Sequence, residues 1–228
     1  MALHRVVPYT TGDLTVVGTF SATGAGSIGD GGSNISAWSG TTGFQTMGGN
    51  ARVWDDWNLP ILAGKITGAN FPNWASFISP TFQYQFAVND TITVSAQEFT
   101  HAWAEGTPIT PHLHWCSGAA NNGTVRGVKW QLDYTWANIN AAEGTIIFPA
   151  VTTIVVEDTI PANEAAFTHH LVNFPTITPT GGKIGAQLIC QLTRVTAAGT
   201  APATNPFALS LGLHFLADTL GSRTATSK

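Results

Sequence analysis

The sequence predicts an all-β protein: an antiparallel β-sandwich, jelly-roll-like, with an extended Gly-rich N-terminal arm. Three observations support this prediction. Short segments from residue 51 onward alternate apolar and polar residues, which is typical of half-buried strands. Stretches rich in turn-forming residues, such as SGAANNG at 117–123, separate these segments. No stretch of useful length has the 3.6-residue period of an amphipathic helix.

The first 50 residues differ in composition from the rest, which predicts an arm (1–50) followed by a sandwich domain (51–228). They hold 11 of the 24 glycines and three charged residues, and they could not form a core alone. A disordered leader and an arm ordered on neighbours both fit this composition, and DLTVVGTF (13–20) could be one strand. The arm is favoured because flexible linkers rarely carry the large aromatics found here, which are Phe20, Trp38 and Phe44.

Two segments show the strand pattern most clearly. In VKWQLDYTW (128–136) apolar residues alternate strictly with polar ones, so one face should be buried and the other wet. In FALSLGLHF (207–215) the face expected to be buried consists of Phe207, Leu209, Leu211, Leu213 and Phe215. The opposite face should carry the small residues that allow another backbone or subunit to approach closely, together with a histidine: Ala208, Ser210, Gly212 and His214.

Further strands complete the expected sandwich. The stretch IPANEAA (160–166) is compatible with a short helix. Many strands at spacings of roughly 10–20 residues favour a sandwich, and a jelly roll in particular. The remaining strands are expected at 91–96, 110–116, 145–157, 167–174 and 183–195.

Composition excludes several classes of function. Only 10% of the 228 residues are charged, against about 25% in a typical soluble protein, which suggests that other subunits cover much of the surface. The net charge of −4 and the lack of a Lys/Arg cluster argue against nucleic acid as a partner. No run of about 18 apolar residues is present to span a membrane. Cys116 and Cys190 lie in apolar runs and are expected to be buried thiols.

The stretch TPHLHWC (110–116) raises the question of a metal site. In a strand, His112, His114 and Cys116 share one face, while Leu113 and Trp115 share the other. The two imidazoles stand about 7 Å apart and could share one ion, whereas Cys116 stands about 13 Å from His112. A third ligand would have to come from another segment. The alternative is a strand with a core face and a polar histidine face, packed on a neighbouring strand or subunit.

A sharper version of the metal hypothesis comes from the spacing Gly106, five residues, His112, Leu113, His114. It resembles the opening of the cupin metal motif, and cupins are also jelly rolls. The cupin pattern continues with a glutamate three or four residues later, but the next acidic residue here is Asp133. His214 could only be guessed as a further ligand. The sequence therefore favours a structural strand, with no metal, cofactor or catalytic residue expected.

Other pairs of polar residues are expected to be structural. His169 and His170 should point to opposite faces of a strand. Asp55 and Asp56 are expected in a turn, flanked by packed Trp54 and Trp57, because neighbouring acids rarely oppose each other as glycoside hydrolysis requires. None of the common nucleophile, phosphate-binding, calcium or zinc motifs occurs. The tryptophans in loop-like contexts leave sugar binding open: Trp38, Trp74 and Trp103.

Three stretches together resemble a family of virion structural proteins of tailed bacteriophages. The first is RVWDDW (52–57) with FPNWASF (71–77), and the last is LHFLADTLGSRTATSK (213–228). The middle one is EGTPITPHLHW (105–115), leading into VKWQLDYTWANI (128–139). The resemblance covers roughly residues 50–228, and its motifs are structural. The histidine pair and closing DTLGSR segment of the family correspond to His112, His114 and Asp218–Arg223, with no catalytic role implied.

The resemblance implies a non-enzymatic virion protein made in the bacterial cytoplasm. The expected function is that of a homotrimeric jelly-roll cement or decoration protein, bound to the major capsid protein shell at the capsid surface. A tail or head-fibre component that binds a carbohydrate receptor is the alternative. A cupin-like metalloenzyme is a third hypothesis, from the Gly106–His114 spacing.

Overall fold

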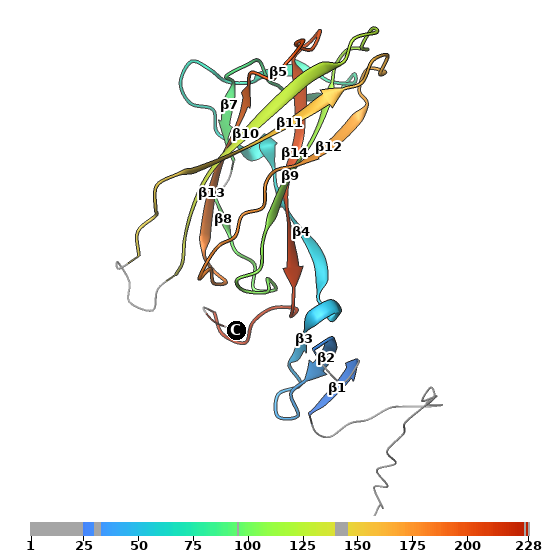
Figure 1. The fold of residues 1–228 in the computed structure, drawn as a ribbon. Helices are drawn as coiled ribbons and strands as arrows, with labels where there is room; N and C mark the ends of the chain where they lie inside the picture. The colour runs from blue at the N-terminus through green and yellow to red at the C-terminus, as the bar shows by residue number, and fades with distance from the viewer. Residues whose placement is uncertain (1–24, 30–32, 95, 140–145, 226, 228) are drawn as a thin grey trace, which may run out of the picture.

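The computed structural model describes residues 25–29, 33–94, 96–139, 146–225 and 227, and these residues form an all-β protein (Figure 1). All pairings between its named strands are antiparallel, and two larger sheets pack against each other around a single core. The predicted fold class, an antiparallel β-sandwich, is confirmed. The jelly-roll connectivity stays a prediction.

The first large sheet has five strands, three of which form its long central part. Strand β10 lies between β11 and β13, and the shorter strands pair with β13. The strands are β11 (Thr152–Ile160), β10 (Arg126–Ala137), β13 (Gln187–Val195), β7 (Thr91–Thr93) and β8 (Gln97–Glu98).

The second large sheet has six strands and is built around β14. Strand β9 pairs along one stretch of β14, while β6 and β4 pair with the beginning and the end of β14. The strands are β12 (His169–Asn173), β9 (Thr110–Ser117), β14 (Pro206–Ala217), β6 (Phe82–Gln85), β5 (Asn73–Ser76) and β4 (Val53–Leu59). Two short 3-10 turns, η1 (Gly49–Ala51) and η2 (Ile61–Ala63), flank β4.

The core lies between the two sheets and is filled by the alternate residues that the sequence pattern indicated. Trp115 on β9 and Trp130 on β10 meet there with ring centroids 6.4 Å apart. Burial of each such aromatic contributes roughly 1.5–3 kcal/mol. The fully buried aliphatic residues around these rings include Leu113, Leu132, Leu188, Leu192, Leu211 and Leu213.

A β-bulge in β14 changes the facing predicted for the start of that strand. The pairing of β14 with β9 shifts by one residue between Ala208 and Ser210. An extra residue reverses the side on which the preceding side chains point. Phe207 therefore leaves the main core and Ala208 enters it, contrary to the prediction from strict alternation. On the outer face Phe207 packs edge-on against Phe77, with ring centroids 5.3 Å apart.

The described part of the N-terminal region forms a small three-stranded sheet. Its strands are β1 (Gly26–Gly29), β2 (Ile35–Trp38) and β3 (Gln45–Met47). Figure 1 shows this sheet beyond one end of the sandwich, and the Met47 N–H donates to the Asp218 carbonyl at 2.6 Å. The possible strand at 13–20 and Phe20 lie outside the described residues. The division of the chain at residue 50 stays a prediction.

Most predicted strands are present, with shifted ends. The strand expected at 145–157 begins only at Thr152, and the compatible helix at 160–166 is a pair of turns. Strand β4 was missed, because RVWDDWNLP was expected to form a turn. It pairs with β14 from Leu59 opposite Leu211 to Val53 opposite Ala217.

Candidate functional site

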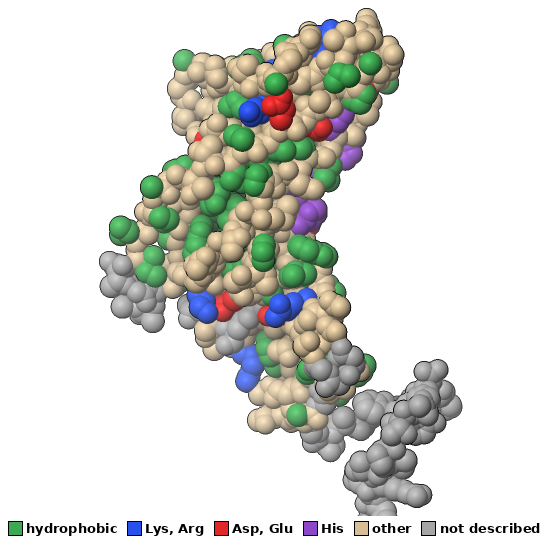
Figure 2. Space-filling view, in the orientation of Figure 1, with side chains coloured by type: hydrophobic (Ala, Val, Ile, Leu, Met, Phe, Trp, Pro, Cys, Tyr) green, Lys and Arg blue, Asp and Glu red, His purple; other side chains and the backbone are tan. Residues whose placement is uncertain are grey.

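The outer face of the six-stranded sheet gathers polar side chains that are far apart in the sequence. Four strands contribute to this histidine face, and Figure 2 shows histidine side chains along one side of the sandwich. Pairing of β14 with β4, and of β9 with β12 and β14, brings the strands together. The members of the histidine face are Asp56 from β4, His112 and His114 from β9, His169 from β12 and His214 from β14.

Asp56, His112 and His214 lie closest together within this face. Each of them offers one ligand atom, and these atoms all lie within 4.8 Å of one another. Asp56 is the direct cross-strand partner of His214, and the imidazoles of His112 and His214 stack with centroids 4.0 Å apart. His112 Nε2 lies 3.6 Å from Asp56 Oδ2. These three residues could therefore hold a metal ion.

Gly212 creates the space in which the His112 ring lies. It is paired directly with His112 in the β9–β14 ladder. A Cβ atom at position 212 would approach His112 Cε1 and Nε2 to 2.4 Å and Asp56 Oδ1 to 2.9 Å. Small residues on this face of β14 were expected to let another backbone or subunit approach closely, but at Gly212 the approaching group is the His112 ring of the same chain.

Burial and neighbouring charges favour the neutral form of two histidines. Burial lowers the pKa of His112, the nearby His214 lowers it further, and the carboxylate of Asp56 opposes them. Burial likewise lowers the pKa of His114, with His169 acting in the same direction. His112 is only 1% exposed. The neutral form is the form in which an imidazole binds a metal.

His114 and His169 form a pair of their own. His114 Nδ1 lies 2.7 Å from His169 Nε2, and the two rings are nearly parallel at a centroid distance of 4.9 Å. One nitrogen must donate and the other accept, so at least one ring nitrogen carries no proton. His114 is also edge-on to His112 at 5.2 Å, which makes the histidine face continuous.

His170 points to the other side of β12, as predicted for adjacent strand residues. Its ring stacks on Trp115 at 4.3 Å, and its Nε2 lies 2.8 Å from Glu164 Oε1. The Trp115 indole N–H donates to Asp158 Oδ2 at 3.1 Å. This set of residues is a polar network at the rim of the core, and the expectation that His170 is structural agrees with these contacts.

The sequence expectations for the polar residues meet different outcomes. His112 and His114 do share a face, but only His112 belongs to the three-residue group, together with His214. The expected turn at Asp55 and Asp56 is wrong, because both lie in β4, where side chains alternate between faces. Trp54 is not packed as predicted but 64% exposed.

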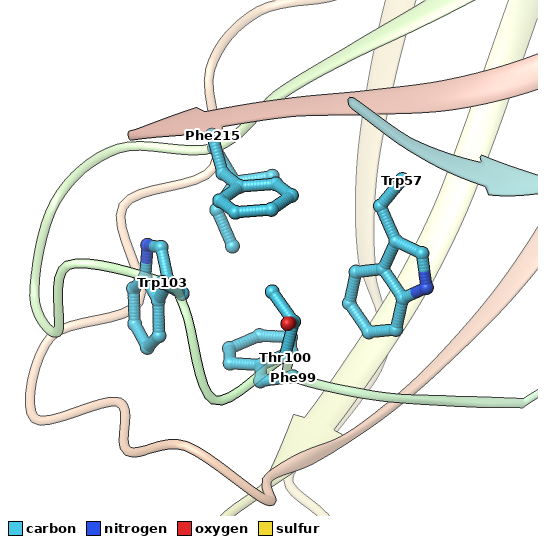
Figure 3. A pocket seen from close by; sticks show the side chains of 6 residues that line it. Trp57, Phe99, Thr100, Trp103 and Phe215 are labelled. Carbon is cyan, nitrogen blue, oxygen red and sulfur yellow. The ribbon is translucent and has the colours of Figure 1, made fainter. Parts of the chain in front are cut away.

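Two of the three tryptophans expected in loops lie in strands instead: Trp38 ends β2 and is partly buried, and Trp74 is in β5 and is 52% exposed. Trp103, a candidate for sugar binding, is 1% exposed and belongs to the core, so that part of the hypothesis is wrong. Figure 3 shows it beside the aromatic rings of Trp57, Phe99 and Phe215, which line a pocket too narrow for a water molecule. This pocket is a packing feature of the core and offers no room for a ligand.

Both cysteines are buried free thiols, as predicted. Burial raises the pKa of the Cys116 thiol to about 11, with the charge of Glu164 adding to the effect. Burial alone raises the pKa of Cys190 to about 12. Neither thiol belongs to the group of potential ligands at Asp56.

Sequence reasoning missed a contact between the C-terminal segment and the sandwich. His101 Nδ1 lies 2.5 Å from Ser222 Oγ, and His101 Nε2 lies 3.4 Å from Glu98 Oε1. The order serine, histidine, acid resembles a catalytic triad, but the Ser222 hydroxyl donates its proton to the Thr224 carbonyl at 2.5 Å. These contacts tie the C-terminal segment to the sandwich.

Comparison with known proteins found no match, either among family models or among curated sequences. Among the described residues, no helix has both the length and the apolar character needed to cross a membrane.

Proposed function

We propose that this chain is a structural virion protein, a homotrimeric cement or decoration protein that stabilises a phage head. The observation that carries the proposal is a surface rich in exposed apolar side chains and poor in charge. The chain has 9 Lys and Arg and 13 Asp and Glu. Figure 2 shows hydrophobic side chains spread over the visible face and few charged ones among them. Large exposed apolar patches mark sites of association.

The first such surface, named here the aromatic edge, lies on the hairpin of β5 and β6. Trp74 is 52% exposed and stacks on Phe82, with centroids 6.0 Å apart. Strand β5 ends the sheet order, so its outer edge has no partner strand within the described part of the chain. An exposed apolar edge strand readily pairs with another chain. Phe71 and Ile78 extend the same exposed region along the chain.

The second surface is the segment 146–151, which precedes β11. Every residue of this segment is exposed, and Ile147 is 82% exposed. In a protein without partners, such a run leaves apolar surface exposed to water, which costs roughly 25 cal/mol of free energy per Å². Contact with a sister copy or with a capsid shell would remove that area from water. Its other large apolar members are Ile146, Phe148 and Val151.

The remaining support comes from the sequence. Its motifs resemble those of phage virion proteins, and that resemblance is the reason to name the shell as the partner and the capsid surface as the location. The small N-terminal sheet is attached to the sandwich through Met47 and Asp218 and would be available for contact with neighbours. The proposal assigns no catalytic activity, nucleic acid or membrane to the chain.

Self-association is the first test. Size-exclusion chromatography with light scattering should give three times the chain mass of 24.0 kDa. The double variant Trp74→Gln, Phe82→Gln should shift the population toward monomer, because it removes the aromatic edge. Leu220→Gln, at a site that is 86% exposed and lies outside β5 and β6, is the matched control and should leave the trimer intact. A monomer at every concentration up to the solubility limit would exclude the trimer.

Attachment to particles is the second test. Purified wild type should co-sediment with phage heads that lack it, and a chain without residues 1–50 should attach more weakly while the sandwich still folds. The circular dichroism spectrum of the truncated chain controls for folding. Failure of the wild-type chain to bind any such head would count against the cement function.

Carbohydrate binding by a fibre component is the alternative function, and the exposed indoles of Trp54 and Trp74 favour it. Trp54 lines a shallow groove with Thr110, Asn173 and His214. Indole faces stack on sugar rings, and nearby polar groups can bind hydroxyls. A glycan array probed with wild type and with Trp54→Ala and Trp74→Ala separates the two functions. Binding that both variants abolish would favour the fibre protein, and a blank array would favour the cement protein.

A further inference from the structure

We propose that Asp56, His112 and His214 form a binding site for one divalent transition-metal ion of the zinc class. Their ligand atoms lie within 4.8 Å of one another and come from three strands that are distant in the sequence. Two imidazole nitrogens and one carboxylate oxygen suit Zn²⁺, Co²⁺ or Fe²⁺ better than Ca²⁺ or Mg²⁺, which prefer oxygen donors. The site stands independently of the cement function proposed above.

The distances are close to those of a formed site. Around a tetrahedral Zn²⁺ with bonds of about 2.0–2.1 Å, ligand atoms stand about 3.3 Å apart. His112 Nε2 and Asp56 Oδ2 are already 3.6 Å apart. The stacked ring of His214 has to turn, because an ion must lie in the plane of each imidazole that binds it. His214 is only partly buried and the Asp56 side chain is 49% exposed, so both can move while His112 stays fixed.

The burial of His112 adds to this geometry. This ring is almost completely buried, so the neighbouring side chains hold it in one position. Its Nε2 is 3.6 Å from the nearest carboxylate oxygen, which is longer than a hydrogen bond. The carboxylate of Asp56 therefore does not satisfy Nε2 by a hydrogen bond. A metal bond to Nε2 would satisfy the nitrogen that faces Asp56.

The strand pairing gives the ion a structural consequence. Asp56 is on β4, His214 is on the neighbouring β14, and His112 is on β9 at the far side of β14. Strand β4 pairs only with β14 among the described strands. An ion would therefore join β4 to β9 across β14 and hold the strand that follows the N-terminal region. A fourth coordination position would face the groove at Trp54 and Thr110, where water or a partner's side chain can enter.

The test uses the full chain, purified without an affinity tag and stripped with a chelator that is then removed. Titration with Zn²⁺ in a calorimeter should give one ion per chain, and the melting temperature should rise with Zn²⁺ concentration, because the ion binds the folded state. Co²⁺ should give the visible absorption bands of a nitrogen- and oxygen-bound tetrahedral ion. Asp56→Asn and His214→Gln should each weaken Zn²⁺ affinity at least about tenfold, since loss of even an outer partner of a ligand has that effect.

Matched controls separate this site from weak binding by surface histidines. Asp55→Asn changes the carboxylate next to Asp56. His101→Gln changes a histidine that is partly buried, as His214 is, but lies outside the site. Both variants should bind Zn²⁺ as wild type does. His169→Gln should also bind normally. All variants are compared for melting temperature without metal, so that a folding defect is visible. The proposal is wrong if wild type binds no ion, if the controls lose as much affinity as the ligand variants, or if only His169→Gln loses it.

Discussion

The two large sheets share the same alternation of side chains but differ on their outer faces. In β10 the outward residues Lys129, Gln131, Asp133 and Thr135 are all partly exposed. In β9 two of the outward residues, His112 and Cys116, are each only 1% exposed, while Thr110 and His114 are partly exposed. Both strands have a paired strand on each side, so an unpaired edge does not explain the difference.

The flanking strands explain it. Beside β9, strand β14 presents the large rings of Phe207 and His214, with Gly212 between them. Beside β10, the outward cross-strand neighbours have smaller or more flexible side chains, such as the short Val155 and the flexible Gln191. Alternation therefore determines which side of a strand faces the core. Cross-strand neighbours determine whether the other side is wet or covered.

The largest expected effect concerns the core that the two sheets share. Trp115→Ala and Trp130→Ala, one on each sheet, should each lower the free energy of unfolding by about 3–5 kcal/mol, because each leaves a large cavity in the shared core. Urea denaturation at neutral pH measures this. Gln131→Ala, on the outer face of β10, is the control and should change stability by less than about 0.5 kcal/mol. Equal losses for Gln131→Ala and the tryptophan variants would mean that the core is not where the sandwich places it.

The next effect tests the covered outer face of β9. Gly212→Ala should destabilise the protein by about 1–3 kcal/mol, because the new Cβ would lie 2.4 Å from the His112 ring. In a His112→Ala background the clash with the ring is absent and only the approach to the exposed Asp56 Oδ1 remains, so the same substitution should cost much less. A double-mutant cycle from urea denaturation gives the coupling between the two sites. A coupling near zero would show that the ring does not lie over Gly212.

The pH dependence of stability should separate the two outer faces further. His112 and His114 have lowered pKa values in the folded chain, so below their usual pKa of about 6.5 the unfolded chain binds more protons. Their contribution to stability is complete above pH 6.5 and is lost as the pH falls toward the folded pKa. Melting temperature measured with chelator from pH 7.5 to 5 should therefore decrease.

Protonation of carboxylates also lowers stability in acid, so the dependence of melting temperature on pH has to be compared between variants. His112→Gln removes one titrating group and should melt with a shallower dependence on pH than wild type, whereas Lys129→Gln on the other sheet should keep the wild-type slope. Identical slopes for all three proteins would show that the proton affinity of His112 does not change when the chain unfolds.

The smallest effect concerns the thiols, which should be inert. With pKa values of about 11 and about 12, Cys116 and Cys190 are almost fully protonated at pH 8, with roughly one Cys116 in a thousand as thiolate. A thiol reagent such as Ellman's reagent should give no signal until denaturant is added. Cys190→Ser isolates Cys116 on the outer face. Fast reaction of Cys116 in the folded Cys190→Ser chain would mean that this face is open to solvent.

Much of the candidate site could not be predicted because it depends on pairing between distant strands. His112 was singled out from TPHLHWC, and its facing followed from alternation alone. The local sequence around Asp56 favours a turn, since two adjacent carboxylates flanked by tryptophans are typical of turns when the partner strand is unknown. No local signal predicts the place of His214, because the register between β14 and β9 joins residues about 100 positions apart.

The sequence by itself determined that this protein is a β-sandwich, that Leu113, Trp115 and Leu132 lie in its core, and that its cysteines are buried. These properties follow from local alternation, which every strand carries in its own residues. Tertiary structure alone decided the bulge that turns Phe207 outward and the meeting of Asp56, His112 and His214. Contacts across strands depend on which backbones hydrogen-bond and in what register, and that is a property of the whole folded chain.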